Sequence, residues 1–130
     1  MQYLKTYLKT ITDRGNPQLA ESIAKTAEDV GNKHIKNFSF SSHEIGLLFG
    51  NVQSGKTGQM FGIMCKAADL GFPAFVLLTT DNVVLQEQTL ERVRADLQGF
   101  CICGENDSGL FIQNSLMEPA IIVLKKNYRV

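Results

Sequence analysis

An excess of either charge is missing from this chain of 130 residues. Lys plus Arg equals Asp plus Glu, at 13 each, so no net basic field indicates nucleic-acid binding. No apolar run approaches the length of a membrane-spanning helix, and the amino terminus lacks the apolar block of a signal peptide. The 44% of hydrophobic residues suits a compact soluble domain. We therefore expect a cytoplasmic protein without a membrane partner.

Cysteine and histidine are also scarce. The three cysteines are odd in number, and Cys65 lies inside an expected helix, so a disulfide framework is not indicated. Cys101-x-Cys103 lacks a second cysteine or histidine pair for a metal site, and two buried strand thiols are the preferred interpretation. Neither His34 nor His43 has a plausible catalytic nucleophile or a carboxylate pair as a partner, so catalytic residues remain unknown.

One motif carries most of the chemical information. The phosphate-binding loop pattern G-x-x-x-x-G-K-[ST] is matched at every specified position by Gly50-Asn51-Val52-Gln53-Ser54-Gly55-Lys56-Thr57. Such a loop wraps a phosphate with its backbone N–H groups, ahead of the positive end of a helix. Lys56 would reach the β- and γ-phosphates, and the Thr57 hydroxyl would ligate Mg²⁺. The sequence thus predicts a nucleotide site that takes ATP and Mg²⁺.

The surrounding sequence predicts an α/β fold with a parallel sheet, the architecture of a P-loop NTPase. We expect buried strands at 45–49, 74–78 and 120–124, and helices at 57–70 and about 82–97, with Leu90, Val93 and Leu97 on one face of the second helix. Two short strands, Phe100 to Cys103 and Leu110 to Gln113, complete the pattern.

A helical hairpin is predicted ahead of this fold. Helical spacing covers residues 1–12, and Asn16 has the character of an N-cap with Pro17 at the first position of a second helix, which Gly31 ends. The expected domains are a hairpin at 1–31 and a partial P-loop NTPase at 32–130. Packing is the simplest role for the hairpin.

Several further residues have two interpretations. Phe40 or His43 could stack on an adenine ring, or the phenylalanines could be core and the histidines solvated. Thr79, Thr80 and Asp81 follow a strand at the edge where ligands bind in such sheets, so they could contact phosphate or nucleic acid. Thr80 or Asp81 could instead cap the next helix.

Four stretches carry a resemblance to a known family, the Z-one domain family, over roughly residues 45 to 130. They are the phosphate-binding loop, Lys66-Ala67-Ala68-Asp69-Leu70-Gly71, Leu77 to Asn82 with Gln88, Thr89 and Arg92, and Ile122-Val123-Leu124-Lys125-Lys126-Asn127. The family comprises large bacterial proteins described as candidate endonucleases, with a helicase-like ATPase core and links to DNA restriction and modification. The resemblance implies a RecA-like helicase motor lobe. By similarity to superfamily-two helicases, it implies DNA contact through Thr79, Thr80, Gln88 and Arg92.

The sequence also departs from a complete ATPase of this kind. Hydrolysis needs a strand-end acidic residue that holds Mg²⁺ and an arginine from a second lobe, whereas the strand at 121–124 ends in Lys125-Lys126. We therefore expect an amino-terminal fragment that binds ATP but hydrolyses it poorly alone. Nuclease residues and the partner domains would lie outside it. Exposed core at the truncated edge would favour a homo-oligomer.

Two other functions remain open. A small nucleoside or nucleotide kinase can carry a Ser-Gly-Lys-Thr loop, although the sequence offers no acceptor-site base and no arginine-rich lid. In a non-enzymatic assembly domain, the loop would hold phosphate or nothing and the hairpin would mediate association.

Overall fold

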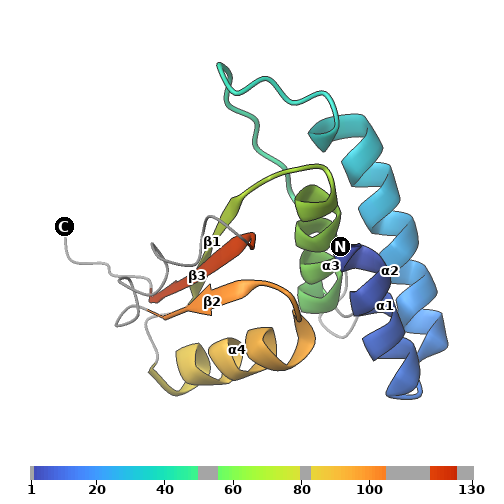
Figure 1. The fold of residues 1–130 in the computed structure, drawn as a ribbon, viewed down its shortest axis with the longest axis vertical. Helices are drawn as coiled ribbons and strands as arrows, with labels where there is room; N and C mark the ends of the chain where they lie inside the picture. The colour runs from blue at the N-terminus through green and yellow to red at the C-terminus, as the bar shows by residue number, and fades with distance from the viewer. Residues whose placement is uncertain (1, 50–55, 80–82, 105–117, 126–130) are drawn as a thin grey trace. The chain divides into compact units, whose positions relative to one another are not determined.

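The structure, a computed structural model, describes residues 2–49, 56–79, 83–104 and 118–125 (Figure 1). These residues form a mixed α/β structure with four α-helices and a three-stranded parallel sheet. They divide into two compact units, a helical unit of residues 2–71 and a sheet unit that begins at Phe72.

The amino-terminal hairpin consists of α1 (Tyr3–Asp13) and α2 (Pro17–Val30). The predicted start of α2 is confirmed, since the Asn16 side chain accepts a hydrogen bond from the Leu19 N–H at 3.2 Å and Pro17 occupies the first helical position. Apolar spacing predicts a stripe of Leu4, Leu8 and Ile11 on α1. Leu4 and Ile11 are buried, whereas Leu8 is half-buried and Tyr7, from the adjoining side, is the third buried residue. Local sequence signals thus suffice for this hairpin.

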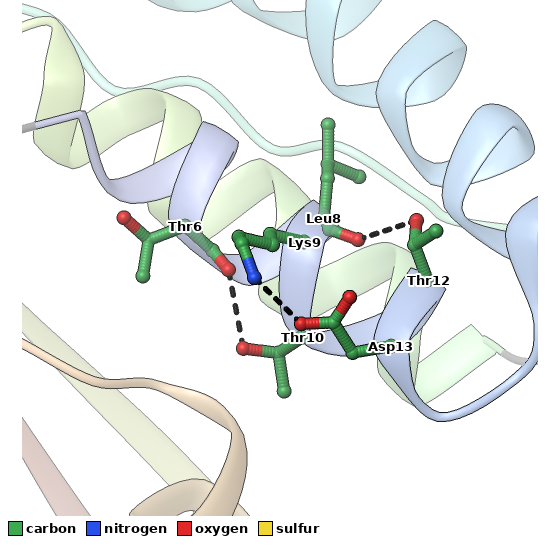
Figure 2. A network of polar contacts seen from close by, with 6 residues as sticks. All are labelled: Thr6, Leu8, Lys9, Thr10, Thr12 and Asp13. Carbon is green, nitrogen blue, oxygen red and sulfur yellow. Dashed lines mark hydrogen bonds and ion pairs between the residues drawn. The ribbon is translucent and has the colours of Figure 1, made fainter.

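The polar side of α1 carries its own short-range contacts (Figure 2). Thr10 and Thr12 donate their hydroxyl protons to the carbonyls of Thr6 and Leu8, at 3.1 and 2.9 Å. Lys9 forms an ion pair with Asp13 at 2.7 Å, and this contact raises the pKa of the lysine. Both charged groups are exposed, so the pair adds little to stability.

The helix that follows the phosphate-binding motif, α3 (Lys56–Asp69), packs on both hairpin helices. Its contacts with α2 advance in step, from Ser22 beside Gln59, through Ile23 beside Gly62, to Gly31 beside Lys66. The two helices therefore run parallel, side by side in Figure 1. A helix of 14 residues is about 21 Å long, so the connection from α2 must return over that length before α3 begins.

Glycine makes the close approach of these parallel helices sterically allowed. A Cβ atom on Gly62 would overlap Cγ2 of Ile23, and a Cβ on Gly31 would lie 2.6 Å from Cγ of Lys66. Ile23 is fully buried, so it has little room to move away. The Lys66 ammonium continues past Gly31 to an ion pair with Glu28 at 3.1 Å.

The expectation that Gly31 ends the second helix is confirmed, because α2 stops at Val30 and Gly31 is its C-cap residue. Gly31 keeps right-handed helical angles, φ −59° and ψ −47°, and opens a π-helical turn, η1 (Gly31–Ile35). It is buried against Lys66, so this glycine serves close packing rather than a left-handed cap. Sequence periodicity alone does not distinguish these two uses.

The strand expected at 45–49 does not form. These residues lie outside regular structure, and the side chains of Ile45, Leu47 and Phe49 are 84, 87 and 91% exposed. An apolar run becomes a strand only when a neighbouring strand supplies hydrogen bonds and a packed face, and strand propensity depends on that context. Phe40 is exposed as well, which overturns its assignment to the core.

The sheet unit contains β1 (Ala74–Thr79), β2 (Cys101–Cys103) and β3 (Ala120–Lys125). The order β1-β3-β2 places β3 at the centre, parallel to both neighbours, with Val76 opposite Ile122 and Leu78 opposite Leu124. These strands confirm three of the predicted apolar runs. The expected strand at Leu110 to Gln113 lies outside the described residues.

Burial in this sheet is uneven. The central strand buries Ala120, Ile121 and Val123, whereas Val76 and Leu78 of β1 are 60 and 68% exposed. β1 is therefore a partly exposed strand at an outer position of the described sheet, rather than the fully buried strand expected. Its burial alternates residue by residue, the pattern of a strand with one covered face.

The helix α4 (Val83–Asp96) contacts β1 and β3. The predicted inner face is confirmed, since Val93 is fully buried, Leu97 just after the helix is buried and Leu90 is half-buried. Within the described residues, no helix combines the length and apolar character needed to cross a membrane.

Candidate functional site

The predicted phosphate-binding loop meets the described structure at the start of α3. Lys56 and Thr57 are the first two residues of that helix, and both are exposed. The first turn contains no acidic residue, so no carboxylate competes there for the positive end of the helix. The remaining predicted loop residues lie outside the described residues: Gly50, Asn51, Val52, Gln53, Ser54 and Gly55.

The hairpin holds the turn directly after Lys56 and Thr57. The buried Tyr7 hydroxyl of α1 donates to the Gly58 carbonyl at 3.2 Å. From the neighbouring position, Gln59 Nε2 donates to Ser22 Oγ of α2 at 3.0 Å. Both hairpin helices therefore make polar contacts to the first turn of α3.

Gln59 is buried, and its Oε1 atom has no hydrogen-bond partner in the described structure. A buried acceptor without a donor normally carries a free-energy cost of about 1–3 kcal/mol. One side-chain amide thus has one satisfied and one unsatisfied end in the first turn of α3. The Gln59 amide is therefore a buried polar group at the contact between α3 and α2.

At the opposite end of α3, Asp69 caps α1. Its carboxylate accepts hydrogen bonds from the backbone N–H groups of Tyr3 and Leu4, at 2.6 and 3.2 Å. One turn earlier on α3, burial together with the Asp69 charge raises the pKa of the Cys65 thiol to about 12. Cys65 is therefore a neutral packing residue.

The two residues considered for adenine stacking are exposed. Phe40 lies edge-to-face with Phe38, with ring centroids 5.3 Å apart, and His43 is exposed in the same connection. His34 pairs with Glu44 at 2.8 Å, so this histidine is bound to a carboxylate of the segment. The solvated histidines predicted by the alternative interpretation are confirmed.

The residues proposed for DNA contact belong to the sheet unit. Thr79 ends β1 and donates its hydroxyl proton to the Leu124 carbonyl at 3.1 Å, which ties it to the neighbouring strand. Gln88 and Arg92 are exposed on α4, and Arg92 Nε lies 3.6 Å from Oδ2 of the buried Asp96. Thr80 and Asp81 lie outside the described residues.

The three cysteines are buried and form no disulfide with one another, so the expectation of buried thiols is confirmed for Cys101 and Cys103. Across the parts of the chain that the structure describes, no three His, Cys, Asp or Glu side chains gather in a way that could hold a metal ion. The predicted Mg²⁺ contact would run through Thr57 and the nucleotide.

Sequence reasoning missed the residues that hold the first turn of α3. The hydrogen-bond partners of Tyr7 and Gln59 lie 51 and 37 residues away in the sequence, so neither residue has a local signal for its contact. The one available signal was a pair of glycines four residues apart, Gly58 and Gly62, on a helix otherwise rich in apolar residues.

Comparisons of the chain with protein-family models, with curated proteins and with solved structures gave no match. The class that the structure itself defines is a mixed α/β protein with a parallel sheet.

Proposed function

We propose that residues 50–57 bind the phosphates of a magnesium nucleotide, with ATP as the expected ligand. The observation that carries the proposal is the complete G-x-x-x-x-G-K-[ST] pattern. The start of an α-helix at Lys56 supports it, because helix amino termini favour anions. Lys56 and Thr57 are exposed there and accessible to a ligand.

The finer assignment follows the resemblance to the Z-one domain family. We infer a RecA-like motor lobe of a DNA-acting, helicase-like ATPase of endonuclease and restriction type, with Thr79, Thr80, Gln88 and Arg92 facing DNA. The parallel order of β1, β3 and β2 is compatible with such a lobe. The test is the rate of ATP hydrolysis with and without added DNA, which DNA should increase if the protein is a DNA-acting ATPase.

Calorimetric titration tests the nucleotide site directly. Mg²⁺–ATP should bind the wild type, and Lys56→Ala should weaken binding at least about tenfold, because a charge-assisted hydrogen bond to phosphate is lost. Lys36→Ala, an exposed lysine outside the motif, is the matched control and should bind as the wild type does. Equal affinity of the Lys56 variant and the wild type would overturn the proposal.

Thr57→Ala separates the metal contact from the phosphate contact. It should weaken binding of Mg²⁺–ATP more than binding of ATP in EDTA, because the hydroxyl is proposed to ligate the metal. Equal weakening in both buffers would remove the metal role. Phosphoryl transfer to an added nucleoside would favour the kinase alternative instead.

A further inference from the structure

We propose that the α1–α2 hairpin positions the first turn of α3 for phosphate binding, with Tyr7 of α1 and Ser22 of α2 as its positioning residues. This inference rests on the proposed nucleotide site and assigns a function to the amino-terminal helices, for which the motif offers none. The hairpin and α3 belong to the same compact unit, so their contacts are defined within it.

Two hydrogen bonds join the hairpin to the first turn of α3. Tyr7 of α1 holds the carbonyl of Gly58, and Ser22 of α2 holds the side chain of Gln59. These positions follow Thr57 directly, in the turn whose N–H groups would face the phosphate. The hairpin therefore forms hydrogen bonds to α3 in the same turn at which the phosphate would bind.

The backbone at Gly58 depends on a neighbouring helix to fix its conformation. Gly58 has no side chain of its own with which to pack, and glycine is the residue with the greatest backbone freedom. The Tyr7 hydroxyl constrains the Gly58 peptide, and the Tyr7 ring is 1% exposed and lies edge-to-face with Phe61, at a centroid distance of 6.3 Å. The buried Tyr7 side chain thus supplies a fixed hydrogen-bond donor to the carbonyl of a glycine, whose backbone would otherwise be free to adopt other conformations.

These two contacts should raise the affinity of the site for Mg²⁺–ATP. A site whose donors are held in the binding geometry loses less conformational freedom when the ligand arrives. Removal of the Tyr7 or Ser22 hydroxyl should therefore weaken Mg²⁺–ATP binding even in fully folded protein. Nucleotide binding should in turn slow amide hydrogen exchange in α1 and α2 wherever their opening abolishes binding.

The experiment compares nucleotide Kd values with thermal unfolding for three variants. Tyr7→Phe keeps the buried ring and removes only the hydroxyl, and Ser22→Ala removes the partner of Gln59 from a residue that is itself exposed. Each should raise the Kd by about two- to tenfold, the range given by loss of one hydrogen bond. Asp69→Ala is the matched control, because it loosens α1 from the far end of α3. It should lower the melting temperature and leave the Kd unchanged.

Three results distinguish the outcomes. Weaker binding by both hydroxyl variants with an unchanged Kd for Asp69→Ala would support the positioning role. Wild-type Kd values for Tyr7→Phe and Ser22→Ala, with binding lost in Lys56→Ala, would overturn the inference and leave the nucleotide site intact. Absence of nucleotide binding by folded wild-type protein would overturn both.

Discussion

The carboxylate of Asp69, in the last turn of α3, accepts a 2.6 Å hydrogen bond from the backbone N–H of Tyr3, at the first residue of α1. The residue preceding α1, Gln2, makes no side-chain cap hydrogen bond. A helix amino terminus needs acceptors for its first N–H groups and favours negative charge. α1 therefore obtains its cap from a residue 66 positions away in the sequence.

Asp69→Ala should destabilise the protein by about 0.5–2 kcal/mol, the cost of losing a helix cap. The hydrogen bonds to both Tyr3 and Leu4 are lost in this variant. Chemical denaturation measures the free energy of unfolding. Asp13→Ala, which removes an exposed ion pair from the other end of α1, should change it by much less. Equal effects of the two variants would remove the capping role.

Gly62→Ala should destabilise the protein although alanine is the better helix former. The gain in helix propensity is about 1 kcal/mol, whereas overpacking against the buried Ile23 costs about 1–3 kcal/mol. Gly58→Ala is the matched control, because its new Cβ would lie 3.4 Å from its nearest neighbours, a distance that packing accommodates.

A double-mutant cycle tests the cause of the Gly62 effect. Ile23→Ala alone should cost about 2–5 kcal/mol, and combined with Gly62→Ala it should cost clearly less than the sum, because the new methyl enters the vacated space. Strict additivity in denaturant unfolding would show that Ile23 is not the source of the clash.

Stability should fall above pH 9 partly because of Cys65. Its ordinary pKa of 9.0 rises to about 12 in the fold, where burial and then the Asp69 charge disfavour the thiolate. Between these values the unfolded chain binds fewer protons than the folded one, so unfolding becomes easier as pH rises. The stabilising contribution is complete below pH 9 and is lost by about 1.4 kcal/mol per pH unit above it.

The comparison for this pH effect is Cys65→Ala, which should show a shallower loss of stability between pH 9 and 10.5. Other titrating groups affect both proteins alike, so the difference between their slopes isolates the thiol. Parallel slopes would contradict the assignment of a raised pKa to Cys65.

Self-association through β1 is expected at high concentration. Val76 and Leu78 are exposed on an uncharged strand at an outer position of the described sheet, opposite the half-buried Ile122 and Leu124. Exposed apolar strands without charge are sites of intermolecular pairing. The mass measured by light scattering should be lower for Leu78→Lys than for the wild type. Glu87→Lys, on the exposed side of α4, should have the same mass as the wild type. A monomeric wild type at high concentration would contradict this prediction.

Local signals predicted those elements whose causes are local. Asn16 and Pro17 mark a helix start through neighbouring atoms, and the burial of Leu4 and Ile11 follows from the apolar spacing of one helix face. The unbroken apolar run at 120–124 predicted β3, whose neighbours on both sides are present. Such features can be predicted without knowledge of the rest of the chain.

Other features depended on distant partners and could not be predicted. Gly31 has the sequence character of a helix end, but its role comes from Lys66, and the polar hold on Gly58 comes from Tyr7. The run at 45–49 has strand character, but its side chains are exposed. The phosphate-binding motif was identifiable because it is contiguous, whereas the residues that support its helix come from two other helices, α1 and α2.

The connection between η1 and α3 has a consequence for proteolysis. Residues 39–49 are almost entirely exposed and carry Phe40 and Phe49, both of which suit chymotrypsin. A cut there would break the chain between α2 and α3 and leave their packing untouched, along with the contacts of Tyr7 and Asp69. The two fragments should consequently remain together as a non-covalent complex on a sizing column and separate only in denaturant.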